Sequence, residues 1–207
     1  MTLRLATEAD AAALVDIYAP FVRDTLVTYE CEVPSVETFA ARIAGIRGAY
    51  PYLVAEADGR IAGYAYAHRY RERAAYDWDA ETSIYLDPAY CGRGIGRAMY
   101  GALLTLLEMQ GVRMALACIT LPNPASVGLQ EAFGFTRAAT FSRIGFKLGQ
   151  WSDGATYVKR LGDDSAQPAP VRRFDALAPD VVADVLAAFR LKSALTADAS
   201  AGGAARR

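Results

Sequence analysis

Histidine and cysteine, two residue types on which many functional sites depend, are scarce in this chain. Among its 207 residues there are one histidine, His68, and three cysteines, Cys31, Cys91 and Cys118. A single histidine excludes a histidine-rich metal site, and it leaves room for a Ser-His-Asp triad only if His68 serves it. The cysteines are odd in number and widely spaced, which indicates a reduced, cytoplasmic protein. We expect His68 to be a packing or surface residue and no metal to be bound.

Excess charge and long apolar runs are lacking too. The chain has 22 Lys and Arg against 23 Asp and Glu, a formal net charge of −1, which argues against charge-driven binding to nucleic acid or to a membrane surface. No apolar run reaches the roughly 18–20 residues of a transmembrane helix. The first residues, Met1–Leu5, lack a signal-peptide pattern. With 53% hydrophobic residues the chain can bury a core, and its length suits one domain plus an appendage.

The most informative stretch is Glu81–Tyr100, which has the pattern of a strand, a glycine-rich turn and a helix. The turn contains Gly92, Arg93, Gly94, Ile95, Gly96 and Arg97. Glycines let the backbone N–H groups of such a turn approach an anion, and the helix start and the arginines add positive charge. No Gly-Lys-Ser/Thr follows, and a dinucleotide fingerprint lacks its third glycine. The turn therefore predicts a phosphate site, with a tight turn that binds nothing as the alternative.

Helical and strand patterns alternate along the rest of residues 1–161. Helices are predicted near 7–23, 34–46, 96–110 and 121–134, and strands near 3–6, 52–55, 61–66, 82–86, 113–119, 138–141 and 157–161. Asp58–Gly59 is a strong signal for a two-residue hairpin turn. The connection from His68 to Asp79 is too polar and aromatic for a core element. This order indicates an α/β domain with a mixed central sheet flanked by helices.

The composition changes after Leu161. Residues 162–177 have the composition of a linker, residues 178–195 contain an amphipathic helical pattern, and residues 196–207 are rich in alanine and glycine. We expect a linker, an accessory helix and a disordered tail in that order. This extension carries no recognisable chemistry, and it is expected to dock on the domain or on a partner.

The strand, the x-x-Gly-x-Gly turn and the helix together resemble the acetyl-CoA pyrophosphate loop of the GCN5-related N-acetyltransferases (GNAT). The family pattern Arg/Gln-x-x-Gly-x-Gly/Ala maps onto residues 91–96, with Cys91 in place of the Arg or Gln. Residues 121–135 look like the family's second CoA-contacting segment. The resemblance covers roughly residues 3–161. It implies a GNAT fold and acetyl-CoA as co-substrate.

The resemblance also implies which residues bind the cofactor. Backbone groups of the strand would bind the pantetheine arm as if it were another strand, the glycine-rich turn would bind the pyrophosphate, and Asn123 would hydrogen-bond the arm. The implied residues are Ile84, Tyr85, Leu86, Gly92, Arg93, Gly94, Ile95, Gly96, Arg97, Asn123 and Ser126.

Four further stretches are similar to one branch, the phosphinothricin or methionine sulfone/sulfoximine N-acetyltransferases. They are residues 50–56, 75–78, 81–86 and 145–151. This branch implies a homodimer and a small amino-acid substrate with a carboxylate and a second strongly polar head group. The implied substrate residues are Arg73, Ala74, Ala75, Tyr76, Glu81, Thr82 and Ser83. A guanidinium such as that of Arg73 suits bidentate binding of a carboxylate or phosphinate, and Arg71 is a secondary candidate.

Glu81 matches the branch's proposed general base. An α-amine is protonated at neutral pH, so a base must remove a proton before the nitrogen can attack a thioester. Without the resemblance, Glu81 would be read as an exposed carboxylate at a strand edge. No general acid can be named, because the fourth helix offers Phe133 and Phe135 near the place where many acetyltransferases have a tyrosine.

Direct transfer in a ternary complex is expected, because no cysteine occupies a convincing nucleophile position. Cys91 falls in the phosphate turn, and Cys118 is predicted to lie in the core of a strand. Two alternatives stay open. One is a peptide or protein N-acetyltransferase, which needs an open groove, and the other is a non-catalytic CoA-binding sensor that uses the C-terminal helix to contact a partner.

Overall fold

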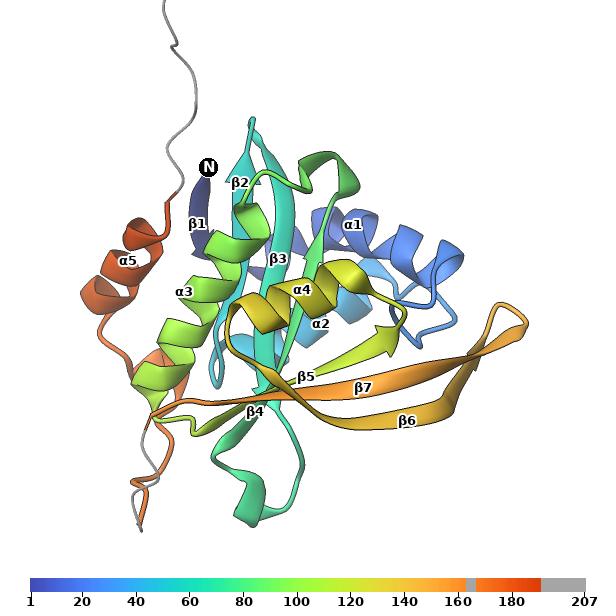
Figure 1. Ribbon diagram of the computed structural model, residues 1–207. Helices are drawn as coiled ribbons and strands as arrows, with labels where there is room; N and C mark the ends of the chain where they lie inside the picture. The colour runs from blue at the N-terminus through green and yellow to red at the C-terminus, as the bar shows by residue number, and fades with distance from the viewer. Residues whose placement is uncertain (163–166, 191–207) are drawn as a thin grey trace, which may run out of the picture.

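A mixed seven-stranded sheet runs through the part of the chain that the structure describes, residues 1–162 and 167–190 of the computed structural model (Figure 1). The strands are β1 Thr2–Leu5, β2 Tyr52–Ala57, β3 Arg60–Arg69, β4 Asp79–Leu86, β5 Met114–Leu121, β6 Thr136–Lys147 and β7 Gln150–Arg160. Their order across the sheet is β1-β2-β3-β4-β5-β7-β6. Neighbouring strands are antiparallel except β4 and β5, which are parallel. The predicted mixed sheet is confirmed.

Helices cover both faces of this sheet (Figure 1). They are α1 Ala11–Asp24, α2 Val36–Arg47, α3 Ile95–Gln110, α4 Pro124–Ala132 and α5 Pro179–Ala188, with 3-10 turns η1 Glu8–Asp10, η2 Ala74–Tyr76, η3 Pro88–Tyr90 and η4 Phe174–Ala176. Alternation along β3 separates two cores, because successive side chains point to opposite faces. Tyr64 packs with α1 and α2, whereas Ala65 and Ala67 face α3, where their small size lets the helix lie close.

Local sequence explains the ends of several elements. Asp58 and Gly59 have φ angles of 54° and 76° and join β2 to β3, as the two-residue hairpin signal predicts. The Ser35 hydroxyl accepts a hydrogen bond from the Thr38 backbone N–H at 3.1 Å and caps α2. Gly111, at φ 93°, ends α3 in the left-handed conformation that glycine favours.

The C-terminal extension packs on the domain. Phe174, Leu177, Val182 and Leu186 are buried in the same core as α3. Gln110, at the end of α3, donates to the carbonyl of Ala49 at 2.8 Å and to that of Arg172 at 2.7 Å, which ties the extension to the α2–β2 corner. Part of the predicted linker (163–166), the end of the predicted accessory helix (191–195) and the predicted disordered tail (196–207) lie outside the described residues.

The hairpin of β6 and β7 is longer than the sequence predicted. The expected strands near 138–141 and 157–161 were too short, because pairing continues to Lys147↔Gln150. A register shift between Phe141 and Gly145 interrupts the two-residue period on which the prediction depended. Large apolar side chains also stand exposed on the projecting part: Phe141, Ile144, Phe146, Leu148 and Trp151. Because these apolar side chains are exposed, this part of the sequence lacks the alternation of apolar and polar residues from which a strand is predicted.

Candidate active site

A gap opens in the sheet where the parallel strands β4 and β5 separate. The two strands pair at Asp79↔Met114, Ala80↔Ala115 and Glu81↔Leu116, and within the described chain no later residue of β4 pairs with β5. On its other side β4 stays paired with β3 as far as Leu86↔Gly63. The second half of β4 therefore has one edge whose backbone groups can accept an added, strand-like ligand.

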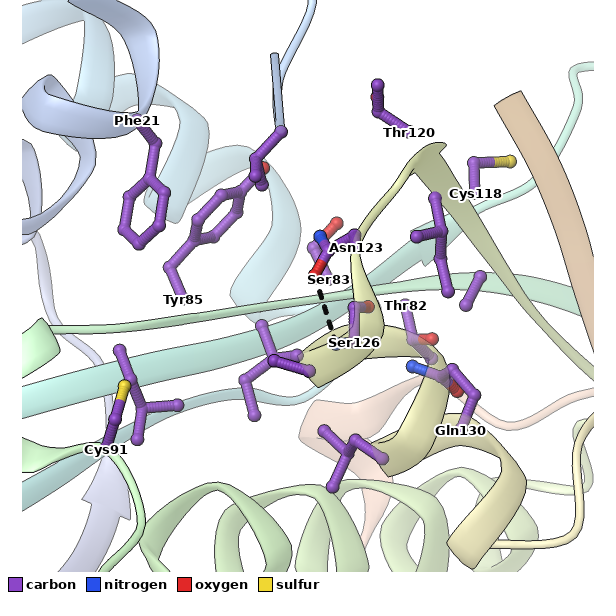
Figure 2. Close-up of a pocket in the computed structure, with 17 residues that line it drawn as sticks. Phe21, Thr82, Ser83, Tyr85, Cys91, Cys118, Thr120, Asn123, Ser126 and Gln130 are labelled. Atoms are coloured by element: carbon purple, nitrogen blue, oxygen red, sulfur yellow. Dashed lines mark hydrogen bonds between the residues drawn. The ribbon is translucent and has the colours of Figure 1, made fainter. Parts of the chain in front are cut away.

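A cleft of about 240 Å³ occupies this gap (Figure 2). Its walls come from the second half of β4, from β5 and from one side of α4, and the end of α1 adds Phe21. Most of the lining side chains are apolar or small, including Ile84, Leu86, Ala117 and Ile119. Such a narrow apolar slot beside a free backbone edge suits an extended chain that contains amide groups.

Five of the predicted cofactor residues line the cleft: Ile84, Tyr85, Leu86, Asn123 and Ser126. The Asn123 side-chain oxygen accepts a hydrogen bond from the Ser126 N–H at 3.1 Å, the dashed line in Figure 2, and so caps α4. Asn123 thus fixes the start of the helix at the cleft wall.

The glycine-rich turn forms the other end of this region. Gly92 and Gly94 have φ angles of 74° and 77°, and Gly94 stands at the N-cap of α3, where it has no side chain to cap the first N–H groups. A Cβ at Gly92 would meet no described atom within 4 Å. Ile95 is buried at 2% exposure, so only its backbone is available to a ligand. The turn has the open backbone that an anion site needs.

The arginines of the turn have protein partners. Arg93 forms an ion pair with Asp58 at 3.0 Å and lies over the ring of Tyr90. Arg97 lies over the ring of Phe133, with 5.4 Å between its guanidinium carbon and the ring centroid. Both contacts hold a guanidinium beside the turn, and both side chains must reorient if they are to bind a phosphate directly.

Glu81 lies at the point where the strands separate. It is half-buried, and its cross-strand neighbours are His68 on β3 and Leu116 on β5. Its carboxylate interacts with the thiol of Cys118, which lines the cleft. Thr82 and Ser83 therefore line the cleft, and Glu81 lies directly before them at its edge.

The predicted position of Cys118 was wrong. It was predicted to lie in the core, but it is exposed and its side chain lines the cleft, because β5 has no β4 neighbour at this level. Partial enclosure by the cleft walls, reinforced by the charge of Glu81, raises the pKa of the thiol to about 11. A thiol with this pKa is almost wholly neutral at pH 7 and is a poor nucleophile.

The predicted substrate residues Arg73, Ala74, Ala75 and Tyr76 lie elsewhere. They form η2 and its N-cap in the loop that precedes β4, and among the described residues none of the four lines the cleft. In Figure 1 this loop projects from the end of the sheet. Arg71, the secondary candidate, lies over the rings of Tyr70 and Tyr76.

A second hollow, of about 260 Å³, lies on the α1 and α2 side of the sheet. Tyrosines of β2 and β3 line it together with Arg42 and His68. Arg42 is held by the carboxylate of Glu30 at 2.7 and 3.1 Å. His68, which lines this hollow, is the cross-strand neighbour of Glu81, and Thr82, which lines the cleft, directly follows Glu81 in the chain. The predicted base therefore lies between the two hollows.

Sequence analysis did not predict one polar cluster at the cleft floor. Thr82 and Gln130 line the cleft, and the buried Tyr100 hydroxyl lies 2.7 Å from the Thr82 hydroxyl and 2.8 Å from the Gln130 amide. Burial raises the pKa of Tyr100 to about 12, so the phenol stays protonated at neutral pH. Only the polar identity of Gln130 on an inward face of α4 could have signalled the cluster.

Two kinds of feature are absent from the described residues. No group of three or more His, Cys, Asp or Glu side chains in this part of the chain is placed to hold a metal ion. Among the helices that the structure describes, none is both long and apolar enough to span a bilayer.

Comparison with known proteins assigns the family. The model of the acetyltransferase (GNAT) domain matches residues 3–155, so the chain belongs to the GNAT acetyltransferase family, and the predicted fold and enzyme class are confirmed. Phosphinothricin N-acetyltransferase of Streptomyces viridochromogenes is 36% identical over 170 residues, which cover 82% of this chain and 92% of that protein. The L-methionine sulfoximine/L-methionine sulfone acetyltransferase of Salmonella typhimurium is 31% identical over 172 residues, 81% of this chain and 98% of that one.

A solved structure agrees with both relatives. The phosphinothricin acetyltransferase of Sinorhizobium meliloti, in complex with AcCoA, matches with a TM-score of 0.78 at 38% identity. The match covers 86% of this chain and 96% of that chain. The predicted resemblance to this branch is therefore confirmed.

Proposed function

We propose that the protein transfers the acetyl group of acetyl-CoA directly to the α-amine of a small amino acid of the phosphinothricin or methionine sulfoximine/sulfone type. The observation that carries this proposal is the unpaired edge of β4, which begins directly after Glu81 and continues along the cleft. The named relatives and the AcCoA-bound neighbour support it.

The residues present fit acetyl-CoA. Backbone groups of Ile84, Tyr85 and Leu86 would hold the pantetheine arm along the free edge, and the open backbone from Gly92 to Arg97 would hold the pyrophosphate. Cys91, which stands where the family pattern has Arg or Gln, also lines the cleft. The backbone amides of the turn therefore supply the main phosphate contacts in this proposal.

Glu81 is proposed to accept a proton from the substrate ammonium, directly or through one water. The freed amine attacks the thioester carbonyl carbon, a C–N bond forms, and the C–S bond breaks. The second proton that the nitrogen then loses passes to the leaving thiolate, directly or through water, so that CoA departs as the thiol. A backbone N–H of β4 would stabilise the negative charge that develops on the carbonyl oxygen. The neutral thiol of Cys118 supports transfer without a covalent acyl-enzyme.

The substrate assignment rests on the relatives and on the chemistry of the loop before β4. Arg73 and Tyr76 are proposed to bind the substrate's anionic groups, although in a single chain they lie outside the cleft. The aromatic hollow beside His68 supports an acceptor of small size.

A homodimer is part of the proposal. Phe141, Ile144, Phe146, Leu148 and Trp151 are each about half exposed, from 48% to 57%, on one projecting hairpin. Clustered apolar surface of this kind marks an interface with another protein chain. Phe146→Asp with Trp151→Asp should shift sedimentation from dimer to monomer, and an unchanged dimer would place the interface elsewhere.

A cytoplasmic location is also proposed. Cys31, Cys91 and Cys118 are all free and exposed in the structure, which suits a reducing compartment.

The test is acetyl-CoA-dependent thiol release with phosphinothricin, methionine sulfone, methionine sulfoximine and a control peptide. Turnover on the small acids supports the proposal, and Arg73→Ala should then raise KM for the acid whereas Arg60→Ala, an exposed arginine at the start of β3, should not. Turnover on the peptide alone would favour a peptide or protein acetyltransferase. CoA binding without turnover on any amine would favour a sensor.

A further inference from the structure

Three buried polar contacts at the cleft floor join four groups, and only two of these groups are hydroxyls, each with one proton to donate. The Thr82 hydroxyl donates to the carbonyl oxygen of Leu116 at 2.9 Å. The same hydroxyl lies 2.7 Å from the Tyr100 hydroxyl, which in turn lies 2.8 Å from the side-chain amide of Gln130. All three distances are those of hydrogen bonds, so each contact needs one proton between its two heavy atoms.

Counting protons fixes the direction of the chain of bonds. A carbonyl oxygen cannot donate, so the single hydroxyl proton of Thr82 is committed to Leu116. The Thr82–Tyr100 contact must then use the single proton of Tyr100. The contact between Tyr100 and Gln130 has no proton left unless the amide nitrogen of Gln130 supplies it.

The orientation that the structure records, with Oε1 of Gln130 2.8 Å from the Tyr100 hydroxyl, fails this count. If the Gln130 oxygen accepted from Tyr100, then either the 2.7 Å contact to Thr82 or the 2.9 Å contact to Leu116 would join two oxygens without a proton. A side-chain amide turned by 180° keeps almost the same shape, so packing does not choose between the orientations and the hydrogen bonds do.

We infer that Gln130 donates its Nε2–H to Tyr100 and presents its carbonyl oxygen, Oε1, to the cleft as a hydrogen-bond acceptor. Gln130 is buried at 2% exposure, and the surface that remains faces the cleft, where Figure 2 shows its amide beside Thr82. Thr82 and Tyr100 are then positioning residues, because they act on a ligand only through the amide that they orient.

An acceptor at this place selects the chemistry of its ligand. This step rests on the proposed function. The pantetheine arm of CoA has one amide separated from its sulfur by a single ethylene unit, and the N–H of this amide would donate to Oε1 of Gln130. Gln130 is therefore assigned as a cofactor-binding residue. Tyr100 keeps its proton at neutral pH because burial raises its pKa to about 12, so the acceptor orientation is stable over the working range.

The orientation can be measured without any ligand. The chain has one asparagine and four glutamines, so an ¹⁵N spectrum contains at most five side-chain carboxamide pairs, and Gln130→Glu identifies one of them. We expect the Gln130 NH₂ pair to be protected from hydrogen exchange and to lose that protection in Tyr100→Phe. Gln110, which donates to two backbone carbonyls, and the exposed Gln150 are the protected and unprotected internal references.

Binding of acetyl-CoA tests the consequence. Gln130→Met should weaken acetyl-CoA binding about fivefold, the size of one neutral hydrogen bond, and Tyr100→Phe should weaken it by a similar factor because the amide is released. Tyr157→Phe is the matched control, since Tyr157 is also fully buried and hydrogen-bonded, to Arg137, but lies outside the cleft lining. Thermal melting separates a loss of fold from a loss of binding.

The two inferences fail in different ways. A Gln130 NH₂ pair that exchanges freely and ignores Tyr100→Phe would show the nitrogen facing the cleft and overturn the assignment, whatever the activity. Unchanged acetyl-CoA affinity in both Gln130→Met and Tyr100→Phe would remove the cofactor role. Wild-type protein that binds no acetyl-CoA would overturn the proposed function and the cofactor role, and leave the measured orientation standing.

Discussion

The two halves of β4 differ in what lies beside them. From Asp79 to Glu81 the strand is paired on both sides, and after Glu81 it keeps β3 and loses β5. Ala80, in the first half, has no exposed surface, whereas Ser83, Ile84 and Tyr85, in the second half, line a cleft. The difference shows that the site depends on a missing row of backbone hydrogen bonds as much as on any side chain.

Thr82 stabilises the boundary between the halves. Its hydroxyl donates to the carbonyl of Leu116, the last residue of β5 that pairs with β4. A side chain thus donates to a backbone acceptor at the point where the β4–β5 pairing ends. Predictions that alter one half and spare the other test this comparison.

The largest expected effect comes from the residue at the boundary. Glu81→Gln should lower kcat about 100-fold or more, because a general base typically contributes that much, while acetyl-CoA affinity stays unchanged. Steady-state kinetics with calorimetry of acetyl-CoA binding measures both quantities. Glu131→Gln, an exposed carboxylate on α4, is the control, and equal losses in the two variants would remove Glu81 from the role of base.

Next in size is a change at the open end of the site. Gly94→Ala should raise KM for acetyl-CoA about tenfold and cost about 1–2 kcal/mol of stability, because alanine is strained at its φ of 77°. Gly59→Ala carries the same strain, at φ 76°, in the turn between β2 and β3. Denaturation should show similar losses in both variants. If Gly59→Ala also raised KM for acetyl-CoA, the rise in Gly94→Ala would be a consequence of lower stability and not of a changed binding site.

A change in the closed half should act on stability alone. Ala80→Val adds two methyl groups at a position with no exposed surface, and overpacking of this kind costs about 1–3 kcal/mol. Urea unfolding should show the loss, and kcat per folded molecule should stay near the wild-type value. A large fall in kcat would mean that both halves of β4 take part in the chemistry.

The smallest expected effect concerns cysteine reactivity at the open edge. With a pKa near 11, about one Cys118 thiol in a thousand is ionised at pH 8, so alkylation should be slow there and accelerate about tenfold per pH unit toward pH 11. Acetyl-CoA should slow the reaction of Cys118 and Cys91, which line the cleft, and leave Cys31 unaffected. Mass spectrometry of the modified peptides measures each rate, and rapid alkylation of Cys118 at pH 8 would contradict the raised pKa.

Local patterns predicted most of the fold. The hairpin at Asp58–Gly59, the left-handed glycines of the turn and the helix that follows it depend on neighbouring residues, and these are readable in sequence. The long β6–β7 hairpin was underestimated because a register shift after Phe141 breaks the strand period. Such a shift depends on pairing with another strand, which the sequence of one strand does not contain.

The site was predictable in part for the same reason. Glu81, Asn123 and Ser126 belong to recognisable motifs, and the structure places them at one cleft or at its edge. Cys118 was misplaced because an apolar strand predicts a buried face, whereas here the neighbouring strand turns away. The chain of bonds from Gln130 to Leu116 joins four separate elements, so no spacing along the sequence indicates it.

The free edge of β4 has one consequence for regulation. Under the proposed function it recognises the pantetheine arm, and that arm is identical in acetyl-CoA and in the free CoA that leaves. A strand edge that binds only the amides of the arm cannot distinguish acetyl-CoA from free CoA. Free CoA should therefore compete with acetyl-CoA at this strand, and the rate should follow the ratio of the two carriers and not the concentration of acetyl-CoA alone.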